Sequence, residues 1–159
     1  MMAVLGAGML FLMVGSAAPA EDAFSPRLEK IMVNGQVLYQ AGKQDGKTVE
    51  ISGDAPARID YTFANKGESA ASEKLAVFVH FVGEDGQMAV QDDYEPNLPT
   101  TKWAKGKDVL DSHLVDLAKF KGRSLTVFIG LYAGDKRIAL ANEKLGDDRR
   151  LQVGILKIK

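Results

Sequence analysis

Short runs of alternating apolar and polar residues, each closed by a turn signal, constrain the fold of this chain more than any other sequence feature. In residues 57–67, Ile59, Tyr61 and Phe63 fall on one side of an extended strand, and the polar side chains between them fall on the other. No long window repeats its apolar residues at the helical period. The pattern therefore predicts strands that each have one buried and one wet face.

Turn signals separate these runs at intervals of about 8–12 residues, the spacing typical of sandwiches and barrels. Asn34-Gly35, Asp85-Gly86 and Gly134-Asp135 each predict a tight turn. Residues 73–83 are apolar on both faces, which indicates a central strand, while residues 117–120 leave room for one helical turn. We expect an all-β fold, an immunoglobulin-like or fibronectin-III-like antiparallel β-sandwich of about 7–9 strands.

The N-terminal residues predict export. Residues 1–20 carry no charged side chain, and their apolar run from Ala3 to Val14 is shorter than the ~20 residues of a spanning helix. Ala18-Pro19-Ala20 has the small-x-small pattern of a signal-peptidase site. We expect a signal peptide over residues 1–20, with a retained membrane anchor as the alternative, then a linker over 21–26 and the sandwich domain over 27–159. The domain would be periplasmic or otherwise extracytoplasmic, with membrane contact only through an uncleaved N-terminus or a partner.

Composition excludes several function classes. The chain has 159 residues, a net charge of -1 and no cysteine, so nothing favours a nucleic-acid partner, a disulfide or a thiolate metal site. No catalytic or metal-ligand motif is present, and we assign no catalytic residue, metal or cofactor. His80 lies among apolar residues and is expected in the core with its ring nitrogens hydrogen-bonded, whereas His113 is expected to be exposed.

Residues 90–107, VQDDYEPNLPTTKWAKGK, form the least regular stretch. Its two prolines cannot continue a central strand, so the stretch should leave one sheet and cross the end of the sandwich.

The aromatic and acidic side chains of this stretch allow two interpretations. Trp103 is expected to cover one end of the core, with its indole N–H bound to a carbonyl. Alternatively, Tyr94 and Trp103 stack on a sugar ring whose hydroxyls bind Asp92 and Asp93. Consecutive strand residues point to opposite faces, so only one of the two acids would face a given site. Calcium binding by these acids is a weaker alternative.

Residues 75–135 also carry a set of short motifs in a fixed order. They are Phe78-Val79-His80, Asp85-Gly86, Gln91 with Asp93, Pro99-Thr100, Trp103, Gly106, Asp111 and Gly130-Leu131-Tyr132. This pattern resembles a β-sandwich module of bacterial envelope proteins, found as the extracytoplasmic C-terminal part of membrane glycosyltransferases of the protein-mannosyltransferase type.

The resemblance is partial. The chain has Gly83 where the family often has an acid, and GRSLTV where the family has G-x-Y. The catalytic membrane portion is absent, so the resemblance implies no transferase activity. It implies a non-catalytic sandwich beside the membrane, in which His80, Gly86, Pro99, Gly106 and Tyr132 are structural residues.

These observations predict an accessory or binding subunit of a bacterial envelope complex, with an envelope or membrane protein as its partner. An edge strand, either residues 150–159 or the hairpin over 27–42, would offer unpaired backbone groups to that partner. Lys157 and Lys159 would then protect the C-terminal edge from self-association. The alternative is a carbohydrate-binding module that uses Tyr94, Trp103 and the nearby acids.

Overall fold

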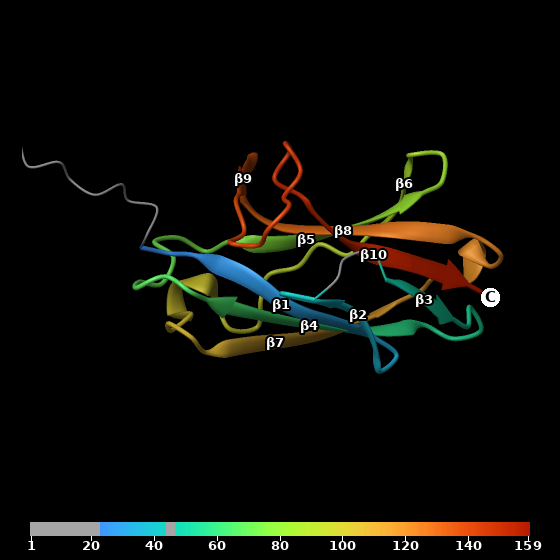
Figure 1. Ribbon diagram of the computed structural model, residues 1–159, viewed down its shortest axis with the longest axis horizontal. Helices are drawn as coiled ribbons and strands as arrows, with labels where there is room; N and C mark the ends of the chain where they lie inside the picture. Colours follow the sequence, from blue (N-terminus) through green and yellow to red (C-terminus); the bar gives the residue numbers. More distant parts are fainter. Residues whose placement is uncertain (1–22, 44–46) are drawn as a thin grey trace, which may run out of the picture.

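The protein is a two-sheet β-sandwich. The computed structural model describes residues 23–43 and 47–159, and the predicted signal peptide or anchor lies outside them. Within these ranges ten strands and two short 3-10 helices form two packed sheets, seen edge-on in Figure 1. The predicted all-β sandwich is confirmed, with ten strands in place of the expected seven to nine. No helix in the described part of the chain has the length and apolar character needed to cross a bilayer.

The first sheet has the strand order β2-β1-β4-β7. Its strands are β1 (Pro26–Val33), β2 (Gln36–Gln40), β4 (Ala57–Asn65) and β7 (Asp108–Val115). Each neighbouring pair is antiparallel. On β4, the inward side chains of Ile59, Tyr61 and Phe63 are at most 2% exposed, as the alternation predicts.

The second sheet has the order β3-β10-β8-β5-β6, and β9 pairs with β8 outside this path. Its strands are β3 (Thr48–Ile51), β5 (Ala76–Gly83), β6 (Met88–Gln91), β8 (Ser124–Ala133), β9 (Lys136–Ile138) and β10 (Leu151–Ile158). The β3–β10 pair is parallel and the other pairs of this sheet are antiparallel. Strand β5 lies between β6 and β8, which confirms residues 73–83 as a source of a central strand.

The connectivity is that of an immunoglobulin-like sandwich. Strands β1, β4 and β7 share one sheet while β5, β8 and β10 share the other, so the chain changes sheets between β4 and β5 and again on either side of β7. This is the Greek-key pattern of such domains. The stretch between β6 and β7 passes from the second sheet to the first, as its prolines predict.

Local turn chemistry fixes the hairpins. Asn34 and Gly35 have φ values of 48° and 79°, the left-handed pair that a type I′ turn requires between β1 and β2. The predicted turns at Asp85-Gly86 and Gly134-Asp135 join β5 to β6 and β8 to β9. The single helical turn expected near residue 118 is the 3-10 helix η3 (Ala118–Phe120).

The C-terminal segment is not a sheet edge, so the prediction that residues 150–159 present a free edge is wrong. Strand β10 lies between β8 and β3, and pairs with β8 over Leu151–Lys157 and with β3 over Ile155–Ile158. Lys157 lies 3.4 Å from Glu50 of β3, and Lys159 pairs with the same carboxylate. These lysines therefore join β10 to β3. The hairpin over 27–42 does supply an edge, at β2, and the opposite edge of that sheet is β7.

The described part of the predicted linker is docked against the sandwich. Ser25 accepts a hydrogen bond from the Lys66 N–H at 2.8 Å, and its own N–H donates to the Asn65 side chain at 3.1 Å. The Phe24 ring lies 6.1 Å from the Trp103 ring, measured between centroids. Strand β1 begins directly afterwards at Pro26.

Candidate functional site

The four predicted binding residues separate into three places. Trp103 lies in the core at one end of the sandwich, and Asp92 and Tyr94 lie at the seam between β6 and β7. Asp93 lines a pocket on the outer face of the second sheet. Asp92 and Asp93 point to different surroundings, as alternation along an extended chain predicts.

Trp103 is a core residue. Its side chain is 0% exposed, packs 5.7 Å from the Phe63 ring, and donates its indole N–H to the Leu98 carbonyl at 2.8 Å. This arrangement matches the expected end-of-core position. It also corrects the carbohydrate hypothesis, because a ring without an exposed face cannot stack on a sugar.

Asn65 anchors this end of the sandwich, a role that no local sequence pattern indicates. The side chain is fully buried at the end of β4. Its amide nitrogen donates to the Ser69 and Trp103 carbonyls at 2.8 and 3.1 Å, and its oxygen accepts from the Ser25 and Gly67 N–H groups. One amide thus satisfies backbone groups from three segments.

The residues expected to be structural at this end and at the turns occupy defined backbone positions. Pro99 precedes the 3-10 helix η2 (Thr100–Lys102), and its carbonyl accepts from Lys102 at 2.8 Å. Gly106 has a φ of 68° and donates its N–H to the Asn65 carbonyl at 2.7 Å. Gly86 has a φ of 76° in the β5–β6 turn.

A hydrogen-bonded cluster closes the seam between the two sheets. Asp92 accepts from the Tyr61 hydroxyl at 3.2 Å and lies 2.8 Å from the His113 Nδ1. The side chains of His113 and Asp92 are 22% and 20% exposed, so His113 faces the seam and the expectation that it is exposed is wrong. Burial raises the pKa of Tyr61 well above its ordinary value of 10.0, and the Asp92 charge adds to this rise.

Tyr94 packs into the same seam. Its ring meets the His113 ring edge-to-face at 4.1 Å between centroids. Burial raises the pKa of Tyr94 far above its ordinary range, with Asp111 as the second cause. The hydroxyl is buried and has no hydrogen-bond partner in the described part of the chain. Asp111 is itself buried and accepts the Asn97 N–H at 3.0 Å.

The outer pocket is the remaining arrangement of interest, a cavity of about 250 Å³ on the outer face of the second sheet. It lies over β5 and β8 beside the β8–β9 hairpin that rises from the sandwich in Figure 1. Its lining comprises Phe78, His80, Gln91, Asp93, Tyr132, Gly134, Asp135 and Arg137. Five of these residues belong to the sequence motifs described above.

Asp93 organises the polar side of the outer pocket. One carboxylate oxygen accepts from the Val79 N–H at 3.2 Å, and the other accepts from the Gln91 side chain at 3.2 Å. His80 is buried, with its Nε2 3.4 Å from the Gln91 Nε2 and 3.9 Å from Asp93. Burial lowers the pKa of His80 below its ordinary value of 6.5, although Asp93 opposes that change. The expected buried position of His80 is therefore correct, but it faces the outer side of the sheet.

The aromatic side of the outer pocket depends on a glycine. A Cβ at Gly130 would lie 2.3 Å from the Phe78 ring, so only glycine lets that ring lie against β8. The Arg137 guanidinium covers the Phe78 ring at 5.1 Å from its centroid, and Tyr132 lies 6.3 Å away. Phe78 is consequently buried, while Tyr132 is only half-buried.

Within residues 23–43 and 47–159, no group of three or more His, Cys, Asp or Glu side chains is placed to hold a metal ion. No protein-family model matches this chain, and a search of curated proteins found no match. The resemblance to the mannosyltransferase-type module therefore stays a prediction.

Proposed function

We propose that the protein is a non-catalytic, exported accessory subunit that binds an envelope or membrane protein through strand β7. The supporting observation is a pair of exposed leucines on this edge strand. Leu110 and Leu114 are 68% and 72% exposed, the highest values among its large hydrophobic residues in the described part.

Strand β7 has the geometry of a strand-addition surface. Among the described strands it pairs only with β4, so its other backbone edge offers N–H and C=O groups to a partner strand. The two leucines lie on the outer face, about 13 Å apart at the rise of a strand. Between them, Ser112 donates its hydroxyl to Asp60, which also binds Arg58 at 2.9 Å.

This pattern defines the partner segment. An extended segment with two apolar side chains spaced four residues apart would cover both leucines. Polar side chains between these two apolar residues would contact Asp60 and its partners Ser112 and Arg58. Burial of the leucines would supply most of the stabilisation, because each exposed large side chain contributes about 1.5–3 kcal/mol when it is buried.

Site-specific photocrosslinking in cells tests the proposal. A photoreactive residue in place of Leu114 should give one dominant adduct with an envelope or membrane protein. The matched control is Met88, which is 51% exposed on β6, an edge of the other sheet. The same reactive residue there should give little or none of that adduct.

Substitution then tests the leucines themselves. Leu110→Ser combined with Leu114→Ser should weaken binding of the identified partner at least ten-fold, with the urea unfolding midpoint almost unchanged because both side chains are exposed. Equal adduct yields at positions 114 and 88, or unchanged partner affinity in the double variant, would overturn the proposal. An adduct between two copies of this chain would replace the envelope partner with self-association.

A further inference from the structure

The outer pocket lies on the opposite sheet from Leu110 and Leu114 and has no role in the contact proposed above. We infer that it binds one neutral sugar ring, such as the terminal residue of a glycan. The hydrogen-bonding groups of the pocket, its aromatic wall, its charge and its size all favour such a ligand.

Its polar groups suit hydroxyls. A carboxylate accepts up to about four hydrogen bonds. Asp93 uses two of these positions on Val79 and Gln91, and so keeps acceptor capacity on a carboxylate that the protein already holds in place. The Gln91 amide oxygen adds a second acceptor, and the Tyr132 hydroxyl both donates and accepts. Sugar hydroxyls, which also donate and accept, complement this mixture.

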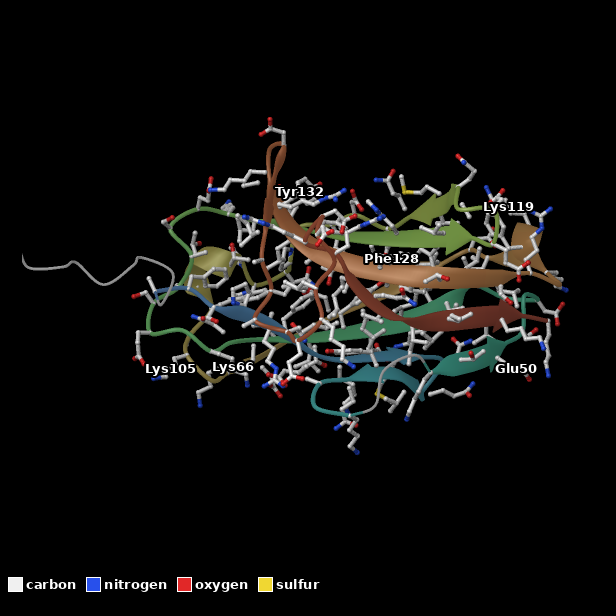
Figure 2. The ribbon with its side chains drawn as sticks, turned by 45° about the horizontal axis from the view of Figure 1, so that its top comes forward. Glu50, Lys66, Lys105, Lys119, Phe128 and Tyr132 are labelled. Atoms are coloured by element: carbon white, nitrogen blue, oxygen red, sulfur yellow. The ribbon has the colours of Figure 1, made fainter. Side chains whose placement is uncertain are left out.

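The aromatic wall suits the C–H face of a sugar. Tyr132, labelled in Figure 2, is the half-exposed ring of the pocket, whereas Arg137 covers the ring of Phe78. Phe78 instead supports Tyr132 from 6.3 Å. An apolar face next to fixed polar groups is the usual composition of a small-molecule site.

Charge and size narrow the ligand class. An anion would meet the carboxylates of Asp93 and Asp135, and the Arg137 charge that could offset them already lies 3.6 Å from Asp148. The lining thus has more negative than positive charge and disfavours an anion, whereas its mixed donors and acceptors and its aromatic face favour a neutral ring over a simple cation. The volume of about 250 Å³ is below the range of about 300–1,000 Å³ for drug-sized ligands, which favours a single ring.

Saturation-transfer NMR on the full chain tests this inference. The probes are the neutral methyl glycosides of glucose, galactose and mannose together with N-acetylglucosamine, and the charged comparison is glucuronate. At least one neutral sugar should bind with a millimolar dissociation constant, and glucuronate should bind at least ten-fold more weakly. Tryptophan emission is unsuitable, because Trp103 is buried outside the pocket.

Two variants assign the binding to the pocket. Gln91→Ala changes an exposed side chain and should weaken sugar binding at least ten-fold, as should Tyr132→Ala. Gln152→Ala is the matched control, since Gln152 is exposed on β10 opposite Phe128 and does not line the pocket. Gln91→Ala keeps the test valid if Tyr132→Ala fails to fold.

Three results would overturn the inference. They are no saturable binding of any neutral probe, equal binding of glucuronate, and unchanged affinity in folded Gln91→Ala. None of them bears on the β7 crosslink, so the two proposals can fail separately.

Discussion

At the scale of single residues, buried polar side chains control how the segments between strands pack. Asn65 shows this most clearly, since its amide makes hydrogen bonds to four backbone groups within a fully buried environment. Replacement by an apolar side chain leaves these groups unpaired, and each unpaired buried group costs about 1–3 kcal/mol.

We expect Asn65→Ala to lower the free energy of unfolding by about 3 kcal/mol, since local shifts let water satisfy part of the lost bonds. Urea unfolding followed by circular dichroism measures the change. Asn97→Ala is the control, because Asn97 is exposed and only its backbone N–H contacts Asp111. A cost below 1 kcal/mol for Asn65→Ala would contradict the role given to this amide.

His80 gives stability a pH dependence of known sign. Burial lowers the pKa of His80 in the folded protein below 6.5, so the unfolded chain takes up the proton more readily. As the pH falls through 6.5, stability is therefore lost, and the loss stops below the folded-state pKa. The charged groups that affect His80 are Asp93 and Asp148, which favour its charged form, and Arg137 and Arg150, which oppose it.

Unfolding midpoints at about pH 7.5 and about pH 5.5 measure this effect. The wild type should lose more stability between these values than His80→Gln, which does not titrate. An equal or larger loss in His80→Gln would show that other groups cause the dependence.

At the scale of elements, the path of β10 depends on one backbone position. Gly154 has a φ of 154° at a register shift between β10 and β8. A Cβ there would lie 2.6 Å from Leu38 and 2.7 Å from the Lys47 carbonyl. The absent side chain thus lets β2 and the start of β3 approach β10 closely.

Gly154→Ala should cost about 3 kcal/mol of unfolding free energy, because it adds a steric clash to an unfavourable backbone angle. Gly122→Ala separates the two causes. Gly122 also has a positive φ, of 78°, but a Cβ there meets nothing within 4 Å. That variant should cost only about 1 kcal/mol. Similar costs for the two variants would show that the close approach at Gly154 contributes little.

The sequence predicts individual strands and turns better than it predicts which strands pair with each other. Alternation and turn residues are local, so β4, the Asn34-Gly35 hairpin and the central position of β5 follow from short windows. Sheet edges depend on which distant strands pair. The parallel union of β3 with β10 joins residues about a hundred positions apart, and no local pattern specifies it.

In the candidate site, too, local sequence predicts some features, while others depend on the pairing of distant strands. Residues two positions apart on an extended chain share a face, and Gln91 and Asp93 accordingly both line the outer pocket. The contributions of Tyr132 and Arg137 come from another hairpin and depend on the pairing of β5 with β8. Whether Trp103 is buried or exposed depends on the core space that distant strands leave to be filled. The local sequence does not reveal that space.

At the scale of the whole molecule, the sandwich is closed on two sides by polar contacts and has no covalent link. Asp92, which follows β6 of the second sheet, binds Tyr61 and His113, which both belong to the first sheet. Near β1, Asn142 donates its amide to the Leu28 carbonyl at 2.9 Å and to the Tyr39 hydroxyl at 2.8 Å. The chain has no cysteine, so these contacts and the packed core carry the stability that disulfides supply in many secreted domains.

The parallel junction of β3 with β10 has a mechanical consequence. Strand β1 starts at one end of the long axis and the C-terminus lies at the other, so tension between the chain ends pulls along the strands (Figure 1). The backbone hydrogen bonds that join β10 to β3 and β8 would then be loaded in shear at the same time. They could not break one after another from one end. The sandwich would therefore resist such a load until many of these hydrogen bonds broke at once.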